Sequence, residues 1–269
     1  MSASTEAGVT IITSTIRKDL MGNLFDNYAR QQWPVKELIV ILNDNAIAMQ
    51  PYLELAKQHA NVRVYRVDER RNLGACLNYA VARAKYPYIA KFDDDDYYSP
   101  HYLDESMLVF HKRNADIVGK RSTYFFFPHR SLLLLRKTAV KPYSRCRRIA
   151  GPTIMFRKRV FKKVAFSTKV VAGSDARFVR ACLKKGFKVY TASSYNFAGC
   201  RRANRKSHTW RISEQQLLAS KGASIIRTQD FKPHVDRSFD LLPLPDGMKP
   251  RNASAANNVR ARRRANRNG

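Results

Sequence analysis

Short apolar runs alternate with longer amphipathic segments along the first hundred residues of the chain. The short runs are rich in β-branched residues, which predicts strands over residues 9–13, 37–42, 62–67 and 88–92. The longer segments place apolar residues three or four positions apart, which predicts helices over residues 19–32, 51–59 and 73–85. Strands that alternate with helices form a parallel sheet with helices on both faces. The pattern therefore predicts the α/β fold class.

Polar side chains follow three of the predicted strands, at the point where each strand ends. The stretches are residues 13–15 (Thr-Ser-Thr), 43–45 (Asn-Asp-Asn) and 93–96 (four aspartates). The carboxyl ends of parallel strands open on one edge of a sheet, where ligands bind in such folds. Neither the G-x-G-x-x-G nor the G-x-x-x-x-G-K-[ST] phosphate-binding pattern occurs in the sequence. The loops therefore predict a nucleotide site without a glycine-rich phosphate loop.

The four aspartates, Asp93 to Asp96, directly follow an apolar run that is typical of a buried strand. Two carboxylates about 5 Å apart repel each other by roughly 3 kcal/mol at an effective dielectric constant of about 20. Such a run therefore needs either solvent or a cation. Carboxylate oxygens are ligands that suit Mg²⁺ or Mn²⁺, which could neutralise the phosphates of a nucleotide. The alternative is a solvated acidic turn.

The net charge of +29 is unevenly distributed along the chain. Residues 1–120 contain 15 basic and 15 acidic residues, so the whole excess lies in residues 121–269. Part of it belongs to residues 251–269, which hold six arginines and almost no apolar side chains and are expected to be disordered. The remainder lies in segments that are expected to fold. A field of this sign attracts polyanions or an anionic membrane surface.

The sequence carries no signal for insertion into a membrane. No apolar run reaches the ~18 residues that a membrane span requires. Residues 1–8 are polar and lack the basic and apolar regions of a secretory signal. We therefore expect a cytoplasmic protein, and the positive charge leaves peripheral contact with the inner face of the membrane open. The absence of C-x-x-C spacing favours reduced thiols and argues against a zinc site for the cysteines, Cys76, Cys146, Cys182 and Cys200.

Several motifs occur in an order and spacing that resemble a family 2 glycosyltransferase with the A-type fold. Those of its nucleotide-sugar half are residues 9–15 (VTIITST), 37–45 (ELIVILNDN), 72–78 (NLGACLN) and 88–100 (YIAKFDDDDYYSP). The second half continues the resemblance with residues 151–158 (GPTIMFRK), 173–175 (GSD) and 186–190 (GFKVY). The resemblance covers roughly residues 8–215 and implies a single domain with a mixed, mostly parallel sheet flanked by helices.

The resemblance also implies how the domain is divided. We expect residues 1–120 to form the nucleotide-sugar-binding half and residues 121–244 the acceptor-binding half of the same domain. Residues 245–269 would form a basic disordered tail. A further helix is predicted over residues 215–220, and the folded unit is expected to end near Leu244.

The resemblance implies that the aspartates form part of a donor site. The D-x-D motif of the family falls on Asp93 and Asp95, of which one would contact the ribose and the other a metal ion, Mn²⁺ or Mg²⁺. Four adjacent aspartates leave the register open, so Asp94 is a further candidate for these roles.

Side chains at the other strand ends match positions that bind the nucleotide in the family. Asp44, with Asn43 beside it, matches the position that hydrogen-bonds the base. Thr13 would approach the base or the ribose. Arg71, or its neighbour Arg70, would meet a phosphate or the base. The alternatives are ordinary turn chemistry for the threonine and a surface location for the arginines.

Asp175 matches the acidic residue that serves in the family as the base for the acceptor hydroxyl. Displacement at the anomeric carbon requires a carboxylate near the incoming nucleophile, and Asp175 is the only acidic residue between positions 121 and 213. Ser174 replaces the glutamate that usually precedes this base and is a candidate for acceptor contact. The alternative is that Ser174 and Asp175 only begin the helix 176–185, as its N-cap and first-turn acid. Gly186 would then end this helix.

Two further candidates lie beyond the predicted base. In related A-type transferases a histidine in this region can complete the metal shell, which makes His208 a candidate metal ligand. Trp210 lies where the family often has an aromatic residue that closes the acceptor side. Imidazole is only a tolerable ligand for Mn²⁺, so a surface histidine is the alternative for His208.

These expectations favour an inverting, metal-dependent glycosyltransferase of hexosyl or N-acetylhexosaminyl type. Its donor would be a nucleotide-diphosphate sugar, with a UDP-sugar expected. The basic half would receive an anionic acceptor of polysaccharide biosynthesis in the cell envelope, such as a polymer, a glycan or a lipid-linked sugar. The alternative is a basic protein that binds polyanions or nucleic acid without catalysis. The neutral first half and the lack of a helix-turn-helix, RRM or zinc-finger pattern argue against nucleic acid.

Overall fold

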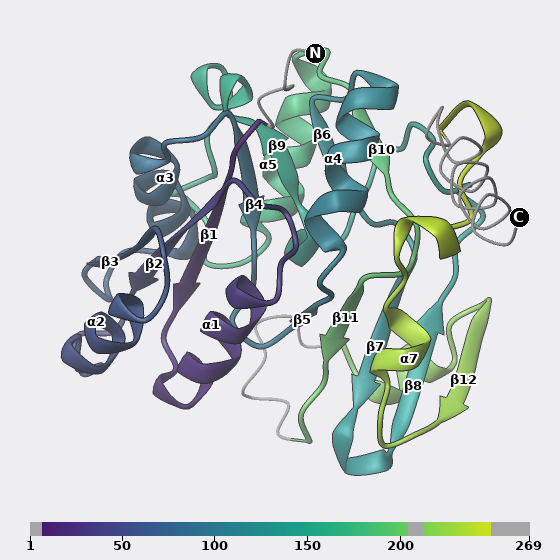
Figure 1. The fold of residues 1–269 in the computed structure, drawn as a ribbon, viewed down its shortest axis with the longest axis horizontal. Helices are drawn as coiled ribbons and strands as arrows, with labels where there is room; N and C mark the ends of the chain where they lie inside the picture. The colour runs from purple at the N-terminus through teal and green to yellow at the C-terminus, as the bar shows by residue number, and fades with distance from the viewer. Residues whose placement is uncertain (1–6, 204–211, 249–269) are drawn as a thin grey trace, which may run out of the picture.

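The computed structural model describes residues 7–203 and 212–248 and contains two β-sheets (Figure 1). The larger sheet has seven strands in the order β10-β6-β9-β4-β1-β2-β3. These strands are β1 (Val9–Thr15), β2 (Lys36–Leu42), β3 (Val62–Arg66), β4 (Tyr88–Lys91), β6 (Ile117–Gly119), β9 (Met155–Arg157) and β10 (Val189–Thr191). Neighbouring strands are parallel except at β9, which runs antiparallel to both β4 and β6. The predicted mixed, mostly parallel sheet is confirmed.

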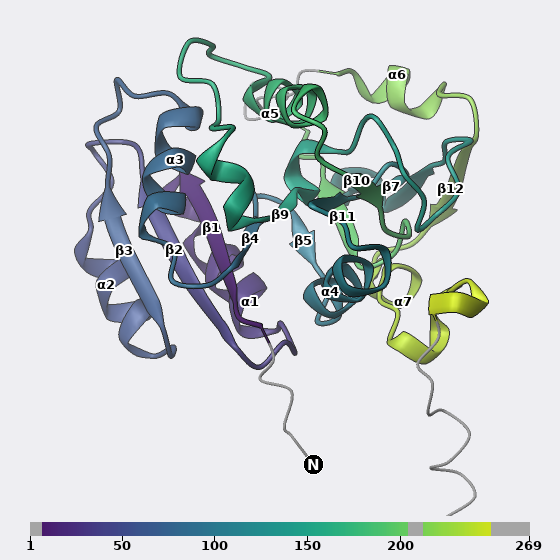
Figure 2. The same cartoon turned by 90° about the horizontal axis from the view of Figure 1, so that it is seen from above.

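Helices cover both faces of this sheet, as Figure 2 shows. They are α1 (Met21–Ala29), α2 (Gln50–Lys57), α3 (Leu73–Arg83), α4 (Tyr102–Arg113) and α5 (Ser174–Lys184). Helices α1, α2 and α4 pack on one face, and α3 and α5 pack on the other. The predicted helix over residues 19–32 is shorter than expected, because its start is a 3-10 turn and α1 ends at Ala29.

Strands β1 and β2 are almost entirely buried because helices cover both of their faces, whereas the edge strand β3 is only half-buried. In β1, Ile11 belongs to the core beneath α1, and its neighbour Ile12 belongs to the core beneath α3. In β2, Val40 and Ile41 divide in the same way. Successive side chains of a strand point to opposite faces, so a strand between two helical layers has no solvent side. This explains why the apolar runs were a reliable signal for the first half of the chain.

A second sheet of five strands was not predicted from the sequence. Its order is β12-β8-β7-β11-β5, and its strands are β5 (Tyr97–Tyr98), β7 (Thr123–Phe127), β8 (Leu132–Arg136), β11 (Phe197–Cys200) and β12 (Ala223–Arg227). Two short helices, α6 (Glu214–Leu218) and α7 (Lys232–Val235), supply Leu217 and Val235 to the two cores of this sheet. The helix predicted over residues 215–220 is confirmed as α6.

The end of the described chain packs back onto the first core. Leu242, Leu244 and Met248 are buried in the same cluster as residues of α4. The folded chain thus reaches at least Met248, beyond the expected limit at Leu244. Short 3-10 turns occur at Lys18–Leu20, Pro128–Arg130, Gly151–Thr153, Lys158–Lys162, Phe239–Leu241 and Asp246–Met248.

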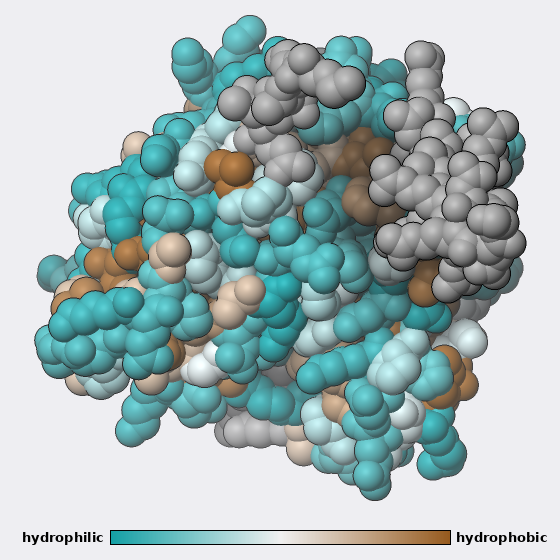
Figure 3. Space-filling model, in the orientation of Figure 1, coloured by the Kyte–Doolittle hydropathy of each residue, from teal (hydrophilic) through white to brown (hydrophobic). Residues whose placement is uncertain are grey.

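The surface is mainly hydrophilic on the face shown in Figure 3, where apolar side chains form small scattered groups. None of the helices in the described ranges is both long enough and apolar enough to cross a membrane. The acidic run lies where the chain leaves β4 of the first sheet and enters β5 of the second. The two sheets therefore meet at the residues for which a ligand role was predicted.

Candidate active site

The loop that carries the four aspartates is fixed from below by two asparagines of α1. The Asn23 side-chain amide donates to the backbone carbonyls of Asp94 (2.7 Å) and Asp96 (3.0 Å). The Asn27 amide also donates to the carbonyl of Asp96 (2.9 Å), and its oxygen accepts from the backbone N–H of Tyr98 (3.0 Å). Because these bonds hold the backbone, the carboxylates project from a defined loop.

Asp94 and Asp95 share the guanidinium of Arg17. The Arg17 Nε and Nη2 atoms donate to the two carboxylate oxygens of Asp94, and Nη1 lies 3.0 Å from Asp95 Oδ2. Thr15 Oγ1 also donates to Asp94, at 2.6 Å. Burial raises the pKa of the Asp94 carboxyl above its ordinary value, although Arg17 opposes this shift. Arg202 follows β11 of the second sheet, and its Nη2 atom lies 3.3 Å from Asp95 Oδ2.

Asp96 faces the second sheet. Its side chain is buried, and its Oδ1 accepts from the backbone N–H of Cys200 in β11 (3.1 Å). Burial, followed by the charges of Asp95 and Asp93, raises the pKa of Asp96 well above its ordinary value. Asp96 therefore joins the acidic loop to the second sheet, which is a different position from that of its three neighbours.

Asp93 is paired with a buried lysine that sequence reasoning missed. The Lys91 side chain is 1% exposed, and its Nζ lies 2.5 Å from Asp93 Oδ1 and 3.2 Å from Asp175 Oδ2. Burial alone would lower the pKa of Lys91, but Asp175 and Asp93 outweigh it and raise the pKa. Burial raises the pKa of Asp93 to about 6, against the opposing effect of Lys91. The available signal was a single lysine inside the apolar run 86–92.

Asp175 lies in the first turn of α5 and is brought to Lys91 by the fold. Its side chain is 22% exposed. Its Oδ2 faces Lys91, whereas its Oδ1 is buried and has no hydrogen-bond partner among the residues that the structure describes. Gly151 makes room for this carboxylate, because a Cβ atom at position 151 would lie only 2.4 Å from Asp175 Oδ2. One carboxylate oxygen is thus held by a cation, while the side chain as a whole stays partly exposed.

The start of α5 differs from the prediction in one respect. Ser174 was a candidate N-cap, but Gly173 occupies that position with a φ of 77°, and Ser174 is the first helical residue. The Ser174 hydroxyl is buried and points toward the start of α3, since a Cβ atom on Gly74 would lie 3.1 Å from it. Gly186 ends the helix as expected, with a positive φ of 82°. A contact of Ser174 with an acceptor stays a prediction.

The other predicted donor residues lie at the carboxyl ends of β1, β2 and β3. The Asn43 amide donates to the carbonyl of Asp68 (2.9 Å), and Asp44 Oδ1 accepts from the N–H of Ala46 (2.8 Å). Both side chains therefore shape the loops around them. Arg71 is exposed, whereas its neighbour Arg70 pairs with Asp68 (Nε to Oδ1, 2.8 Å). Arg71 is accordingly the better placed of the two to meet a ligand.

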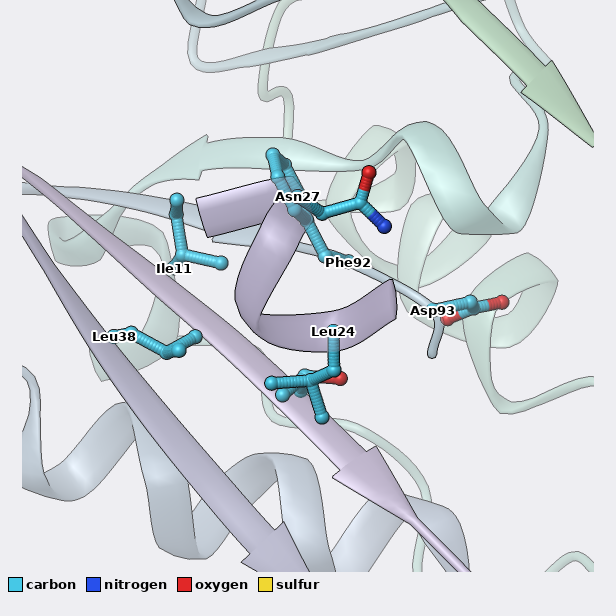
Figure 4. Close-up of a pocket in the computed structure, with 7 residues that line it drawn as sticks. Ile11, Leu24, Asn27, Leu38, Phe92 and Asp93 are labelled. Carbon is cyan, nitrogen blue, oxygen red and sulfur yellow. The ribbon is translucent and has the colours of Figure 1, made fainter. Parts of the chain in front are cut away.

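Thr13 faces a narrow internal space rather than solvent. Its hydroxyl is buried and has no hydrogen-bond partner within the described ranges. The space is bounded by Ile11, Thr13, Leu24, Asn27, Leu38, Phe92 and Asp93 (Figure 4). It is too narrow to hold a water molecule and mostly apolar. We regard it as packing space behind the acidic loop, and not as a ligand pocket.

A metal role was predicted for Asp95 and His208. His208 and Trp210 lie outside the described residues. Within residues 7–203 and 212–248, no three His, Cys, Asp or Glu side chains converge in a way that could hold a metal ion. Mg²⁺ commonly uses only one or two protein carboxylates together with substrate phosphates. The side chain of Asp95 is 14% exposed. It could supply one such carboxylate, so the site fits binding of a cation together with substrate phosphates.

Comparison with curated proteins finds glycosyltransferases. The chain is 27% identical over 171 residues to the O-antigen biosynthesis glycosyltransferase WbnJ of Escherichia coli, which covers 58% of this chain and 63% of that protein. It is 26% identical over 172 residues to the uncharacterized glycosyltransferase MJ1057 of Methanocaldococcus jannaschii, which covers 60% of this chain and 59% of that protein. The chain thus matches about three fifths of the length of each relative.

Comparison with solved structures finds the same architecture. The mannosyltransferase PcManGT from Pyrobaculum calidifontis, solved with GDP-Man and Mn²⁺, superposes with a TM-score of 0.60 at 18% identity over 92% of this chain and 68% of that chain. S. aureus TarS 1-349 in complex with UDP-GlcNAc gives a TM-score of 0.57 at 14% identity over 75% of this chain and 61% of that chain. At these identities the similarity shows the fold, which is the A-type glycosyltransferase fold.

The family model described as glycosyl transferase family 2 matches residues 10–166, more than half of the sequence. The match contains β1, β2, β4 and the acidic run, and it ends before Asp175. The order of motifs along the chain, the sheet topology and this match agree. The chain belongs to glycosyl transferase family 2.

Proposed function

We propose that the protein is an inverting, metal-dependent glycosyltransferase that moves a sugar from a nucleotide-diphosphate sugar to a hydroxyl group of an anionic acceptor. The observation that carries the proposal is the single ammonium group of Lys91 between Asp93 and Asp175. It brings a predicted donor-site carboxylate and a predicted base together at the carboxyl end of β4. Ligands bind at this edge in open α/β sheets.

The donor lies along the carboxyl ends of β1, β2 and β4 in this proposal. Asp93 contacts the ribose, while Asp44 and Arg71 meet the base and a phosphate. The chain is similar to structures solved with UDP-GlcNAc and with GDP-Man, and a UDP-sugar is the donor that we expect. Arg17 and Arg202 lie beside Asp95 and are placed to meet phosphate oxygens.

Asp95 is the residue that would hold Mn²⁺ or Mg²⁺ together with the diphosphate. Its carboxylate is a hard oxygen ligand of the kind that these cations prefer. When bound, the cation would neutralise part of the negative charge of the leaving diphosphate. The cation would then take the place of the contacts that Asp95 makes with Arg17 and Arg202.

Asp175 acts as the general base in the transfer step. The acceptor oxygen attacks the anomeric carbon from the face opposite the diphosphate, and the Asp175 carboxylate takes the proton of the acceptor hydroxyl. The bond between the anomeric carbon and the diphosphate oxygen breaks, and the diphosphate leaves with the electron pair. The anomeric configuration is therefore inverted. The partial exposure of the Asp175 side chain, 22%, supports this assignment, because an acceptor can reach the carboxylate.

Lys91 holds the two carboxylates in place. Two carboxylates about 5 Å apart would otherwise repel each other by roughly 3 kcal/mol at an effective dielectric constant of about 20. Lys91 touches both carboxylates and stays buried, so it fixes the position of the base relative to the donor. We therefore class Lys91 as a positioning residue.

The acceptor is anionic in this proposal because the second half of the chain carries the whole net charge of +29. The name of the Escherichia coli relative refers to O-antigen biosynthesis, which supports an acceptor from the cell envelope. A polymer, a glycan or a lipid-linked sugar would each bring negative charge to this half.

Calorimetric titration of UDP and GDP, with and without Mn²⁺, tests the donor half of the proposal. Wild-type protein should bind one nucleotide in a metal-dependent way, Asp95→Ala should abolish that dependence, and Asp175→Asn should bind the nucleotide normally. Glu54→Gln, which changes an exposed carboxylate of α2, is the matched control and should behave as wild type. Absence of binding of either nucleotide under both conditions would contradict the proposal and would favour a basic polyanion-binding protein.

A further inference from the structure

The exposed face of α5 carries a row of cations that starts two residues after Asp175 and lies on the side of the helix opposite to that carboxylate. Arg177, Arg180 and Lys184 are exposed, and their spacing of three and four positions places them on one side of the helix. The row extends about 10 Å along the axis, because a helix rises about 1.5 Å per residue. The opposite side of α5, with Phe178 and Val179, is buried in the core. Figure 2 shows α5 at the outer edge of the molecule.

No carboxylate neutralises this row in the described part of the chain. Other arginines have such partners, as in the pairs Arg63 with Glu37 and Arg159 with Asp116. The cations of α5 form no ion pair among residues 7–203 and 212–248. Asp175 is the only acidic residue of the sequence between positions 121 and 213. The positive charge of α5 is therefore available to an external anion.

A second basic segment runs to the same carboxylate. The N–H of Cys146 donates to the carbonyl of Val189 in β10 (3.0 Å), which places this segment beside the strand that follows α5. Its cations, Arg145, Arg147 and Arg148, are exposed. The chain then continues to Gly151, which lies against Asp175. Segment 145–148 therefore runs along the chain from beside β10 to Gly151, next to Asp175. Helix α5 begins with Asp175 in its first turn and is followed along the chain by β10.

The apolar residues near these cations do not favour a membrane surface. Binding at a membrane interface combines basic charge with apolar side chains that enter the lipid. Within the described residues the exposed large apolar side chains are Ile16, Val171, Ile225 and Leu241. Only Val171 lies close to α5 in the sequence, and the apolar side of α5 is used by the core. A single valine does not form an apolar face.

The chemistry also does not favour nucleic acid. Proteins that bind single strands pair a basic groove with exposed aromatic side chains on which the bases stack. The residues of α5 and of segment 145–148 include no exposed aromatic side chain. The surface offers charge along a line and nothing that would recognise a base. This combination fits a flexible polymer with a repeated anionic group.

We propose that the cationic track, defined as Arg177, Arg180 and Lys184 of α5 with Arg145, Arg147 and Arg148, binds an acceptor polymer whose repeating units carry phosphate or carboxylate groups. Segment 145–148 continues to Gly151 beside Asp175, and it is the part of the track from which the terminal hydroxyl of that polymer would reach Asp175. The second statement rests on the proposed transferase function, whereas polymer binding by the track does not.

The test compares two triple variants of the full-length chain that remove equal charge. The track variant is Arg177→Gln, Arg180→Gln and Lys184→Gln. The matched control is Lys137→Gln, Lys221→Gln and Arg227→Gln, which changes exposed cations near β8 and β12. The probes are inorganic polyphosphate for phosphate, polygalacturonate for carboxylate, and neutral dextran as the negative control, and binding is measured across a salt series.

The track variant should bind at least one anionic probe roughly 100-fold more weakly than wild type, at about fivefold for each removed cation. Its plot of log affinity against log salt concentration should be less steep by about 2, since each neutralised anion contributes about 0.7 for a flexible chain. The control variant should lose less than about a tenth of that effect. An equal loss in both variants would show binding by overall charge alone and would overturn the proposal.

Two further arms distinguish other partners. Track-dependent binding to vesicles of phosphatidylglycerol and phosphatidylcholine, without track-dependent binding to either polymer, would assign the surface to a membrane and overturn the proposal. Tighter track-dependent binding to oligo(dT) than to polyphosphate would assign it to nucleic acid with the same result. Titration of UDP or GDP with Mn²⁺ separates this inference from the proposed function, because the track variant should bind the nucleotide as wild type does. If neither the wild type nor either variant binds a nucleotide, the proposed transferase function is contradicted. The comparison of polymer binding between the two variants still tests the track.

Discussion

A single ammonium group, Lys91 Nζ, serves two carboxylates that come from distant parts of the chain. Lys91 is buried at the end of β4, where no water can replace it. The desolvation cost of a buried charge is offset only when its partners are close and well oriented. Asp93 and Asp175 meet that requirement, and the arrangement therefore depends on all three residues.

Lys91→Met should leave two like charges facing each other. We expect a loss in the free energy of unfolding that is smaller than the roughly 3–5 kcal/mol of a fully buried ion pair, because the side chains of Asp93 and Asp175 are 32% and 22% exposed. Chemical denaturation measures this loss. The double variant Lys91→Met with Asp175→Asn should recover part of it, because it removes one of the two unpaired carboxylates. Equal stability of the single and double variants would contradict this account.

Gly151→Ala should displace the predicted base without disturbing the donor site. The new Cβ atom would lie 2.4 Å from Asp175 Oδ2, so the carboxylate has to move. A displacement of about 1 Å at a reacting group can reduce a rate by about 100-fold. We expect transfer activity to fall by roughly 10- to 100-fold while the dissociation constant of the nucleotide changes by less than about threefold.

Gly22→Ala is the matched control for this substitution. Gly22 lies in α1, and an added Cβ atom would meet nothing within 4 Å. Alanine is favoured over glycine in a helix by about 0.5–1 kcal/mol. The control should therefore keep full activity and unfold at a slightly higher temperature than wild type. A similar loss of activity in both alanine variants would show that Asp175 is not the group affected.

At the scale of elements, helix α1 acts as the support of the acidic loop. Asn27 is buried and connects the carbonyl of Asp96 with the N–H of Tyr98. Through these bonds a helix at the start of the chain sets the position of a loop between the two sheets. The loop is thus ordered by protein contacts before any ligand binds.

Asn27→Ala should destabilise the protein and weaken nucleotide binding together. It leaves the buried N–H of Tyr98 without its acceptor, which costs about 1–3 kcal/mol. Thermal unfolding and nucleotide titration would measure the two effects. Gln58→Ala, at an exposed position after α2, should change neither quantity. Nucleotide binding unchanged by Asn27→Ala would show that the acidic loop does not need this support.

The predictable elements were those with a simple local signal. Strands β1, β2 and β4 were predicted because strands covered on both faces form apolar runs. The half-buried edge strand β3 was predicted from a weaker apolar signal. The second sheet was missed although β7 and β8 form a local hairpin, because its other pairings join distant segments, such as β5 with β11 and β8 with β12. A short apolar run by itself does not reveal its partner.

The sequence predicted the candidate carboxylates of the site but not the cations that pair with them. Asp93 and Asp175 were found through the motif order, and the structure brings them to one cation. The contribution of Lys91 depends on a contact across the fold that spacing along the chain cannot show. The same holds for Arg17 and Arg202, whose carboxylate partners lie far from them in the sequence.

At the scale of the whole molecule, a second buried ion pair ties α4 to the second half of the chain. Glu105 accepts from Lys120 Nζ (2.9 Å) and from the backbone N–H of Ser193 (2.7 Å), and both ionised side chains are buried. Asn196, just before β11, also donates to Glu105 (3.2 Å). The pair therefore holds together segments that belong to both sheets.

This pair should make stability sensitive to acid. Burial alone would raise the pKa of Glu105, but Lys120 and Ser193 outweigh it and lower the pKa below its ordinary value of 4.5. A lowered pKa in the folded state contributes stability above pH 4.5 that is lost as the pH falls through the lower folded value. Burial lowers the pKa of Lys120, which affects stability only on the alkaline side.

Glu105→Gln should flatten the acid side of the stability profile. Its free energy of unfolding should be lower than that of wild type at neutral pH, by roughly 3–5 kcal/mol for a broken buried pair. The difference between the two proteins should shrink as the pH drops below about 4.5. Urea denaturation at several pH values would measure this. Parallel profiles would show that other carboxylates control the acid limit.

The shared lysine also limits how the enzyme could be redesigned or could evolve. Changes at positions 91, 93 and 175 are not independent, because residues that contact one another show non-additive effects. A variant of Asp175 that fails beside Lys91 could be tolerated beside an uncharged residue at that position. A search that altered one of these positions at a time would miss combinations in which one change offsets another. New specificities around this site are therefore best sought in libraries that vary the three positions together.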